Sequence, residues 1–150
     1  MMSATHSRGL SARSMLAWVM PALALSLAAC AGLGGGAAAS LLGTEWRLVE
    51  IDGEALPERP AATLAFTEPG RVAGSGSCNR FFGSVSFSGE KIGFGQMGAT
   101  KMACLGQDSR IEARYFAALQ QASRYELKDA TLLIHLTDRP APLRFVRTRP

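Results

Sequence analysis

Apolar and polar residues alternate in short runs over much of the chain, with the period of two that is typical of β-strands. Turn-forming residues separate the runs, for example at 52–53, 68–70 and 88–90. The pattern predicts about eight strands. They are residues 45–51, 62–66, 71–77, 80–88, 91–94, 123–128, 131–136 and 143–146.

Strict alternation in the first predicted strand defines two faces. Trp46 and Leu48 fall on one of them, and Arg47, Val49 and Ile51 fall on the other. This strand follows a Gly/Ala-rich stretch, and we expect the folded domain to begin near residue 41.

One segment has a helical period instead. Residues 108–122 repeat apolar side chains at the spacing of one helix face. The predicted stripe contains Ile111, Tyr115, Ala118, Leu119 and Ala122. Asp108 or Ser109 is predicted to cap this helix, and Glu112 lies in its first turn.

These elements predict a mainly β fold. A single helix cannot supply the crossovers that parallel strands need, so the strands are expected to be antiparallel. We therefore predict a small barrel-like rolled sheet of about seven to eight strands with one α-helix packed against it.

The beginning of the chain has the order of a secretory signal peptide. Residues 1–13 are polar and carry Arg8 and Arg13, whereas residues 15–29 are apolar. The apolar run is shorter than the ~20 residues that a membrane-spanning helix needs. A membrane anchor is the alternative, because no charge occurs between Arg13 and Glu45. However, the Gly/Ala-rich continuation is a poor helix former and is predicted to be a flexible tether.

The apolar run closes on Leu27-Ala-Ala-Cys30, which resembles the lipobox of bacterial lipoproteins. The resemblance implies a diacylglycerol thioether on Cys30 and cleavage before it, which divides the chain into a signal peptide (1–29), a lipidated tether (30–40) and a domain (41–150). Because Ala31 rather than Asp follows the cysteine, the usual sorting pattern of such lipoproteins implies the outer membrane in a host that has one, with the domain facing the periplasm. The alternative is a plain signal peptide with an incidental cysteine.

Composition narrows the possible function classes. A chain of 150 residues with 47% hydrophobic and 19% charged residues fits one small globular domain rather than a two-lobed enzyme. Two of the 16 basic residues, Arg8 and Arg13, precede the predicted cleavage site, which leaves 14 basic and 12 acidic residues in the mature chain. This small excess, without interleaved aromatic residues, disfavours a nucleic-acid partner.

Two cysteines, Cys78 and Cys104, remain after Cys30. An even number in an exported protein suggests a disulfide bond. For a loop of 26 residues, chain-entropy reasoning gives a stabilisation of about 3.5 kcal/mol. Two buried thiols or a redox site are the alternatives, although no C-x-x-C motif is present.

Other motifs for chemistry are weak. Residues 93–98 match G-x-G-x-x-G, but no βαβ unit surrounds them. His135 lies within an apolar strand pattern, and too few further ligands accompany it for a structural zinc site. No nucleophile elbow supports a catalytic triad. The sequence therefore predicts no cofactor, no metal and no catalytic residues.

Two further segments, residues 74–83 and 98–104, have specific patterns that predict local structure. Residues 74–83 predict a tight corner in which Gly74 and Gly76 allow either a positive φ or close backbone approach, and in which Asn79 can bond to its own backbone. Either Phe81 or Phe82 is expected to enter the core. Residues 98–104 are expected to return beside this corner and to bring Cys104 to Cys78.

These segments resemble the META domain, or HslJ-like, family. Its pattern has a first strand with Trp, a G-x-x-C-N-x-F-x-G core, a T-x-M-A-C box and a helix of the form E-x-x-aromatic-x-x-x-L. The matching residues are Trp46, Gly74, Cys78, Asn79, Phe82, Gly83, Thr100, Lys101, Met102 and Cys104, with Glu112, Tyr115 and Leu119 in the helix. Lys101 departs from the family's usual Arg, which keeps the charge but loses a planar donor group.

The resemblance implies a small β-domain, often exported or lipid-anchored, that is linked to heat or antibiotic stress and has no established catalytic mechanism. We therefore expect a monomeric, non-enzymatic envelope protein that is held to the membrane by its lipid and acts by binding an unknown protein or small molecule. The alternatives are a small-ligand carrier that uses the barrel lumen, an inhibitor or chaperone of another envelope protein, and an enzyme.

Overall fold

A computed structural model describes residues 36–59 and 61–149 of the chain. The predicted signal peptide (1–29) and the predicted lipidation at Cys30 lie outside the described residues. A short helix, α1 (Gly36–Leu41), occupies the end of the predicted tether. Three successive alanines favour helix there, and the fully buried Leu41 ties the helix to the core, which explains why the tether prediction is wrong for this part. Among the described residues, no helix has the length and apolar character needed to cross a bilayer.

Nine antiparallel strands in the described residues form one sheet with the order β2-β1-β3-β4-β5-β6-β7-β8-β9. The strands are β1 (Glu45–Ile51), β2 (Glu54–Ala55), β3 (Ala62–Glu68), β4 (Arg71–Gly76), β5 (Arg80–Ser88), β6 (Lys91–Ala99), β7 (Ala122–Lys128), β8 (Thr131–Leu136) and β9 (Leu143–Arg149). A further pairing between β1 and β9 closes the sheet into a ring. The predicted mainly β, antiparallel, rolled fold is confirmed.

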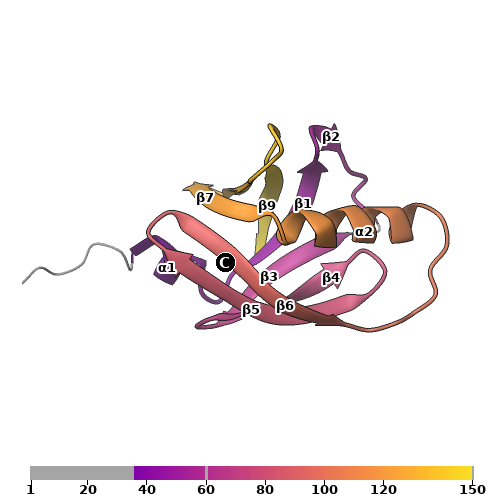
Figure 1. The fold of residues 1–150 in the computed structure, drawn as a ribbon, viewed down its shortest axis with the longest axis horizontal. Helices are drawn as coiled ribbons and strands as arrows, with labels where there is room; N and C mark the ends of the chain where they lie inside the picture. The colour runs from indigo at the N-terminus through magenta and orange to yellow at the C-terminus, as the bar shows by residue number, and fades with distance from the viewer. Residues whose placement is uncertain (1–35, 60, 150) are drawn as a thin grey trace, which may run out of the picture. The chain divides into compact units, whose positions relative to one another are not determined.

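The ring departs from a regular barrel between β6 and β7. These two strands pair only at Lys91 and Arg124, whereas β5 and β6 pair along nearly their whole length. The chain between them forms the helix α2 (Gln107–Leu119), which packs against β3 and β4 (Figure 1). The last turns of the helix lie beside β6, where Gln120 donates a hydrogen bond to the Gly95 carbonyl at 3.5 Å.

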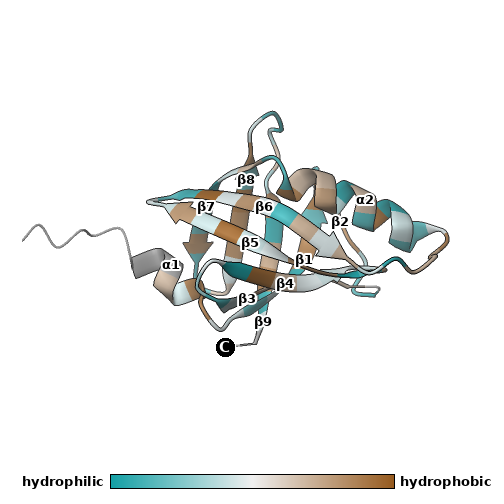
Figure 2. Ribbon diagram, turned by 60° about the horizontal axis from the view of Figure 1, so that its bottom comes forward, coloured by the Kyte–Doolittle hydropathy of each residue, from teal (hydrophilic) through white to brown (hydrophobic). Residues whose placement is uncertain are grey.

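Large side chains fill the interior of the ring. Buried positions alternate with more exposed ones along strands such as β8, and hydrophobic and hydrophilic residues follow one another along the ribbon (Figure 2). The helix adds Ile111, Tyr115, Ala118 and Leu119 to this core, which confirms four of the five predicted stripe residues. The fully buried aromatic side chains are Trp46, Tyr115 and Phe145.

The first strand differs from strict alternation. Ile51 is fully buried together with Trp46 and Leu48, although the sequence pattern placed it on the opposite face. The pairing of β1 with β9 shifts register between Leu48 and Glu50. Such an irregularity offsets the alternation by one residue, so the next apolar side chain turns inward.

Two local predictions for α2 are wrong. The residue at its N-cap is Gly106, and no side chain caps the helix. Ser109 instead donates a hydrogen bond from Oγ to the Gly106 carbonyl at 3.1 Å. The helix also ends at Leu119, because Ala122 already belongs to β7 and pairs with Leu136.

Strand β6 is longer than predicted. It continues to Ala99 through Gly95 and Gly98, although glycine disfavours strands. Pairing with β5 overrides that preference, with Phe82 opposite Gly98 and Gly83 opposite Met97.

Candidate functional site

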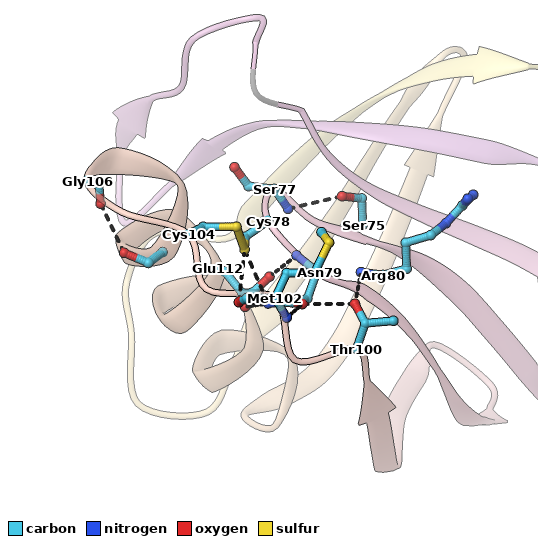
Figure 3. The surroundings of a disulfide bond; sticks show 11 residues. Ser75, Ser77, Cys78, Asn79, Arg80, Thr100, Met102, Cys104, Gly106 and Glu112 are labelled. Atoms are coloured by element: carbon cyan, nitrogen blue, oxygen red, sulfur yellow. Dashed lines mark hydrogen bonds between the residues drawn. A yellow bond between two sulfur atoms is a disulfide. The ribbon is translucent and has the colours of Figure 1, made fainter.

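The two cysteines predicted to pair are joined by a disulfide bond. Cys78 follows β4 and Cys104 precedes α2, and their Cα atoms lie 6.0 Å apart (Figure 3). The bond fixes residues 100–106 against the β4–β5 turn, as the sequence predicted. We call residues 76–80, residues 100–106 and Glu112 the disulfide corner.

Asn79 organises this corner through its side-chain oxygen. Its Oδ1 accepts hydrogen bonds from the Thr100 hydroxyl at 2.9 Å and from the Met102 backbone N–H at 2.7 Å. Asn79 itself is only 6% exposed, whereas Thr100 and Met102 are exposed. The predicted C-N and T-x-M-A-C segments therefore meet through Asn79, rather than through the disulfide alone.

The amide nitrogen of the same side chain is equally engaged. Asn79 Nδ2 donates to Glu112 Oε1 at 2.9 Å, and it also lies 3.4 Å from the Met102 carbonyl oxygen and 3.3 Å from Cys78 Sγ. The Asn79 backbone N–H donates to Glu112 Oε2 at 2.5 Å. Both oxygens of one carboxylate thus bind one residue, an arrangement stronger than a pair of neutral hydrogen bonds.

Sequence reasoning missed this role of Glu112. It assigned the residue to the first turn of the helix and to the family's helix pattern, without a partner. The contact joins residues 33 positions apart, so no local spacing indicates it. The only available signal was the fixed glutamate at the start of the family's helix pattern.

Gly76 in the corner and Gly74 just before it stand where neighbouring segments come too close to leave room for a side chain. A Cβ at Gly76 would lie 2.6 Å from the Glu112 carboxylate and 2.8 Å from the Phe116 ring. A Cβ at Gly74 would clash with the Thr63 carbonyl oxygen on the neighbouring strand. These positions therefore allow the helix and β3 to approach β4, as the sequence predicted for Gly74.

The structure resolves the choice between the two phenylalanines. Phe81 is 2% exposed and packs edge-on against Tyr115 and Phe116 of α2. Phe82, chosen from the family pattern as a site residue, is 67% exposed and points outward. Alternation along β5 allows only one of two successive side chains to enter the core.

The remaining residues of the family pattern divide between core and surface. Trp46 is fully buried and donates a hydrogen bond from Nε1 to Thr44 Oγ1, while the Arg147 guanidinium lies 4.8 Å from its ring centre. Gly83 faces Met97, because a Cβ there would lie 2.9 Å from the Met97 side chain. Lys101 and the side chain of Met102 are exposed.

A second polar cluster lies on the outer face of β7 and β8. His135 Nε2 is 3.0 Å from Glu126 Oε1. Hydrogen bonds from Arg124 and Lys128 hold the pKa of Glu126 down to about 2. Ser123 donates to the backbone carbonyl of His135 rather than to its ring, so the residues do not form a nucleophile–base pair.

The G-x-G-x-x-G match and the possible metal ligands noted in the sequence do not form binding sites among the described residues. The G-x-G-x-x-G residues lie within β6, paired with β5, and not at a helix N-terminus where a phosphate would bind. Among residues 36–59 and 61–149, no group of three or more His, Cys, Asp or Glu side chains is arranged to hold a metal ion. The disulfide corner is thus the strongest site candidate, and the side-chain atoms of Asn79 in it bond to Thr100, Met102 and Glu112.

Comparison with known proteins identifies the domain. A family model described as the META domain matches residues 39–150. An NMR structure of a protein from Burkholderia xenovorans is 27% identical, with a TM-score of 0.61 over 73% of this chain and 85% of that one. No curated protein matches the chain.

Two further solved structures share the fold at lower identity. An NMR structure that is 19% identical has a TM-score of 0.60, over 72% of this chain and 92% of that one. The crystal structure of a DUF4847 family protein from Bacteroides vulgatus is 13% identical, with a TM-score of 0.57 over 77% of this chain and 99% of that one. At these identities the likeness extends to the fold alone.

Proposed function

The chain belongs to the META domain family, and from that premise we propose that it is a lipid-anchored, non-enzymatic envelope protein that acts by binding through its outer surface. The anchor is the lipid predicted on Cys30, and the compartment is the periplasmic side of the outer membrane. The stress tolerance linked to the family, towards heat or antibiotics, is the process we propose it serves.

The observation that carries this proposal is the disulfide between Cys78 and Cys104, together with the lipobox at Cys30. A structural disulfide is stable in an oxidising compartment outside the cytoplasm. With Cys30 lipidated and the other two cysteines in the disulfide, all three cysteines of the sequence have roles expected of an exported protein.

The filled interior supports binding at the surface rather than within the ring. A carrier needs an open lumen, whereas Trp46, Tyr115 and Phe145 occupy this interior. The arrangement of the disulfide corner supports a structural role for its polar residues, because both oxygens of Glu112 accept bonds from Asn79. A general base must instead reach a substrate proton.

Fractionation of cells tests the anchoring step. The wild-type protein is expected in the outer-membrane fraction, and Cys30→Ala is expected in the soluble periplasmic fraction or uncleaved at the inner membrane. Ala31→Ser serves as the matched control, because it changes the neighbouring residue and leaves the cysteine. Equal membrane retention of all three proteins would contradict anchoring through Cys30.

Survival of a deletion strain tests the stress role. We expect the deletion to lower survival under heat or antibiotic challenge, and the wild-type gene to restore it. The Cys30→Ala gene is expected to restore less at equal protein level. Unchanged survival of the deletion strain under both challenges would contradict the role.

A second candidate, an inhibitor or chaperone of another envelope protein, is favoured by a groove between β6 and α2. Met97 and Ala99 line one side of it, and Phe116, Ala117 and Gln120 line the other, around a volume of about 440 Å³. The edge of β6 beside this groove lacks pairing with β7 beyond Lys91, and an extended segment of a partner can add to such an edge. Crosslinking from Ala117→Cys in cells tests this candidate, with an adduct to one envelope protein as the expected result and no adduct as the contrary one.

A further inference from the structure

Most of the exposed large apolar side chains lie in the disulfide corner or on the strand next to it. The described part of the chain exposes four large hydrophobic side chains, and three of them are Phe82, Met102 and Leu105, with exposures of 67%, 58% and 92%. Met102 and Leu105 lie in the segment that the disulfide fixes, and Phe82 lies on β5 two residues beyond Arg80. The fourth, Leu42, follows α1 and is 46% exposed.

The backbone holds these side chains outward. Met102 has its N–H bound to Asn79 Oδ1 and its carbonyl beside Asn79 Nδ2. Leu105 lies between Cys104, which is in the disulfide, and Gly106, whose φ of 80° is unfavourable for other residues. The disulfide thus fixes the backbone next to Leu105, whose side chain is 92% exposed.

Exposed basic side chains lie on the same segments as these apolar ones. Arg80 and Lys101 are exposed within the corner, and Arg110 is exposed one turn into α2. The acidic residues of these segments are Asp108, which is partly buried, and Glu112, whose two oxygens bind Asn79. The exposed charges of the corner and of the first turn of α2 are therefore basic.

We propose that this end of the disulfide corner docks on the surface of an anionic lipid bilayer. Apolar side chains that project from a fixed loop insert at the headgroup boundary, while lysine and arginine beside them attract anionic headgroups. The projection of Leu105 and Met102 from a loop that also carries the exposed Lys101 fits a deformable lipid surface better than a complementary protein groove. The docking would give the domain a fixed orientation on a membrane, which goes beyond attachment by a lipid.

Vesicle binding tests the proposal independently of the predicted lipid. The protein used is residues 30–150 with Cys30→Ser, which contains every described element and the whole core and therefore folds without the preceding segment. The probes are sedimented vesicles of phosphatidylcholine with an equal share of phosphatidylglycerol, and vesicles of phosphatidylcholine alone. We expect binding to the anionic vesicles and at least about fivefold weaker binding to the neutral ones, because each basic residue near the surface adds about that factor.

Three variants separate the contributions. Met102→Ser with Leu105→Ser is expected to weaken binding to anionic vesicles about tenfold or more, since two apolar side chains leave the interface. Arg80→Gln with Lys101→Gln is expected to weaken it by a similar factor and to reduce its dependence on salt. Leu42→Ser, the matched exposed leucine outside the corner, is expected to bind like the wild type. All four side chains of the first two variants are exposed, so the fold and the disulfide are retained.

Three results of these binding measurements would overturn the proposal. Absence of binding to anionic vesicles, unchanged binding of the Met102/Leu105 variant, or an equal loss with Leu42→Ser would each contradict it. Because the lipid is absent from this protein, such a failure would leave the anchoring test at Cys30 unaffected.

Discussion

Both carboxylate oxygens of Glu112 bind Asn79, one through its backbone N–H and the other through its side-chain amide. Glu112 lies in the second turn of α2, not in the first turn as predicted, and its contact connects this turn to the β4–β5 turn (Figure 3). Through Thr100 and Met102 it also connects the loop that leads into the helix. One buried asparagine therefore fixes the position of three segments.

Replacing this carboxylate tests the strength of the connection. Glu112→Gln retains one acceptor but turns an amide towards the donors of Asn79, so we expect a loss of about 1.5–3 kcal/mol in unfolding free energy. Urea denaturation measures it, with the exposed Glu58→Gln as the control that is expected to change little. Equal midpoints for both variants would show that the contact contributes nothing.

Removal of the disulfide tests its energetic contribution. Cys78→Ser with Cys104→Ser opens a loop of 26 residues, and chain entropy predicts a loss of about 3.5 kcal/mol. Reductant is expected to destabilise the wild type by a similar amount and to leave the double variant unchanged. A wild type that is insensitive to reductant under denaturing conditions would contradict a formed bond.

Ser77 lies in the turn of the corner with a φ of 97°, in the region that favours glycine. Its hydroxyl is buried without a partner among the described residues. Ser77→Gly relieves both costs, and after the added entropy of the unfolded chain we expect a stabilisation of about 0.5–1 kcal/mol. Thermal unfolding measures it. Ser86→Gly within β5 is the control and is expected to destabilise, so a loss of stability in both variants would argue against backbone strain at Ser77.

We expect the polar cluster on the outer face of β7 and β8 to make the stability of the fold weakly dependent on pH. The pKa of Glu126 is lowered from 4.5 to about 2 by hydrogen bonds from Arg124 and Lys128. A carboxylate with a depressed folded-state pKa stabilises the fold above its unfolded pKa and loses that contribution as pH falls. The stability difference between the wild type and Glu126→Gln should therefore shrink as pH falls from 4.5 to about 2. It should also shrink with added salt because the pair is exposed, and a difference that grows with acid would contradict the assignment.

The sequence pattern predicted most strands of this fold because alternation and turn residues are local. It missed β2, which has only two residues and therefore no period. It misplaced Ile51 because a register shift in the pairing of β1 with β9 is a property of the partner strand. The length of β6 was likewise set by pairing with β5, against the local preference of its glycines.

The candidate site was predictable to the extent that it is local. The pairing of Cys78 with Cys104 was predicted from cysteine count and is present. The contact of Asn79 with Glu112 was not predicted, because it depends on how α2 lies against β4. The family pattern placed Phe82 among the site residues, whereas packing against Tyr115 selects Phe81 for the core.

We propose that the domain is held outside the cytoplasm by a lipid on Cys30, with the disulfide of its corner formed. Mass spectrometry of the protein purified from host membranes without reductant tests both features in one experiment. We expect a chain that begins at an acylated Cys30 and contains one peptide pair joined through Cys78 and Cys104. A chain that still begins at Met1, with free thiols at those two positions, would contradict it.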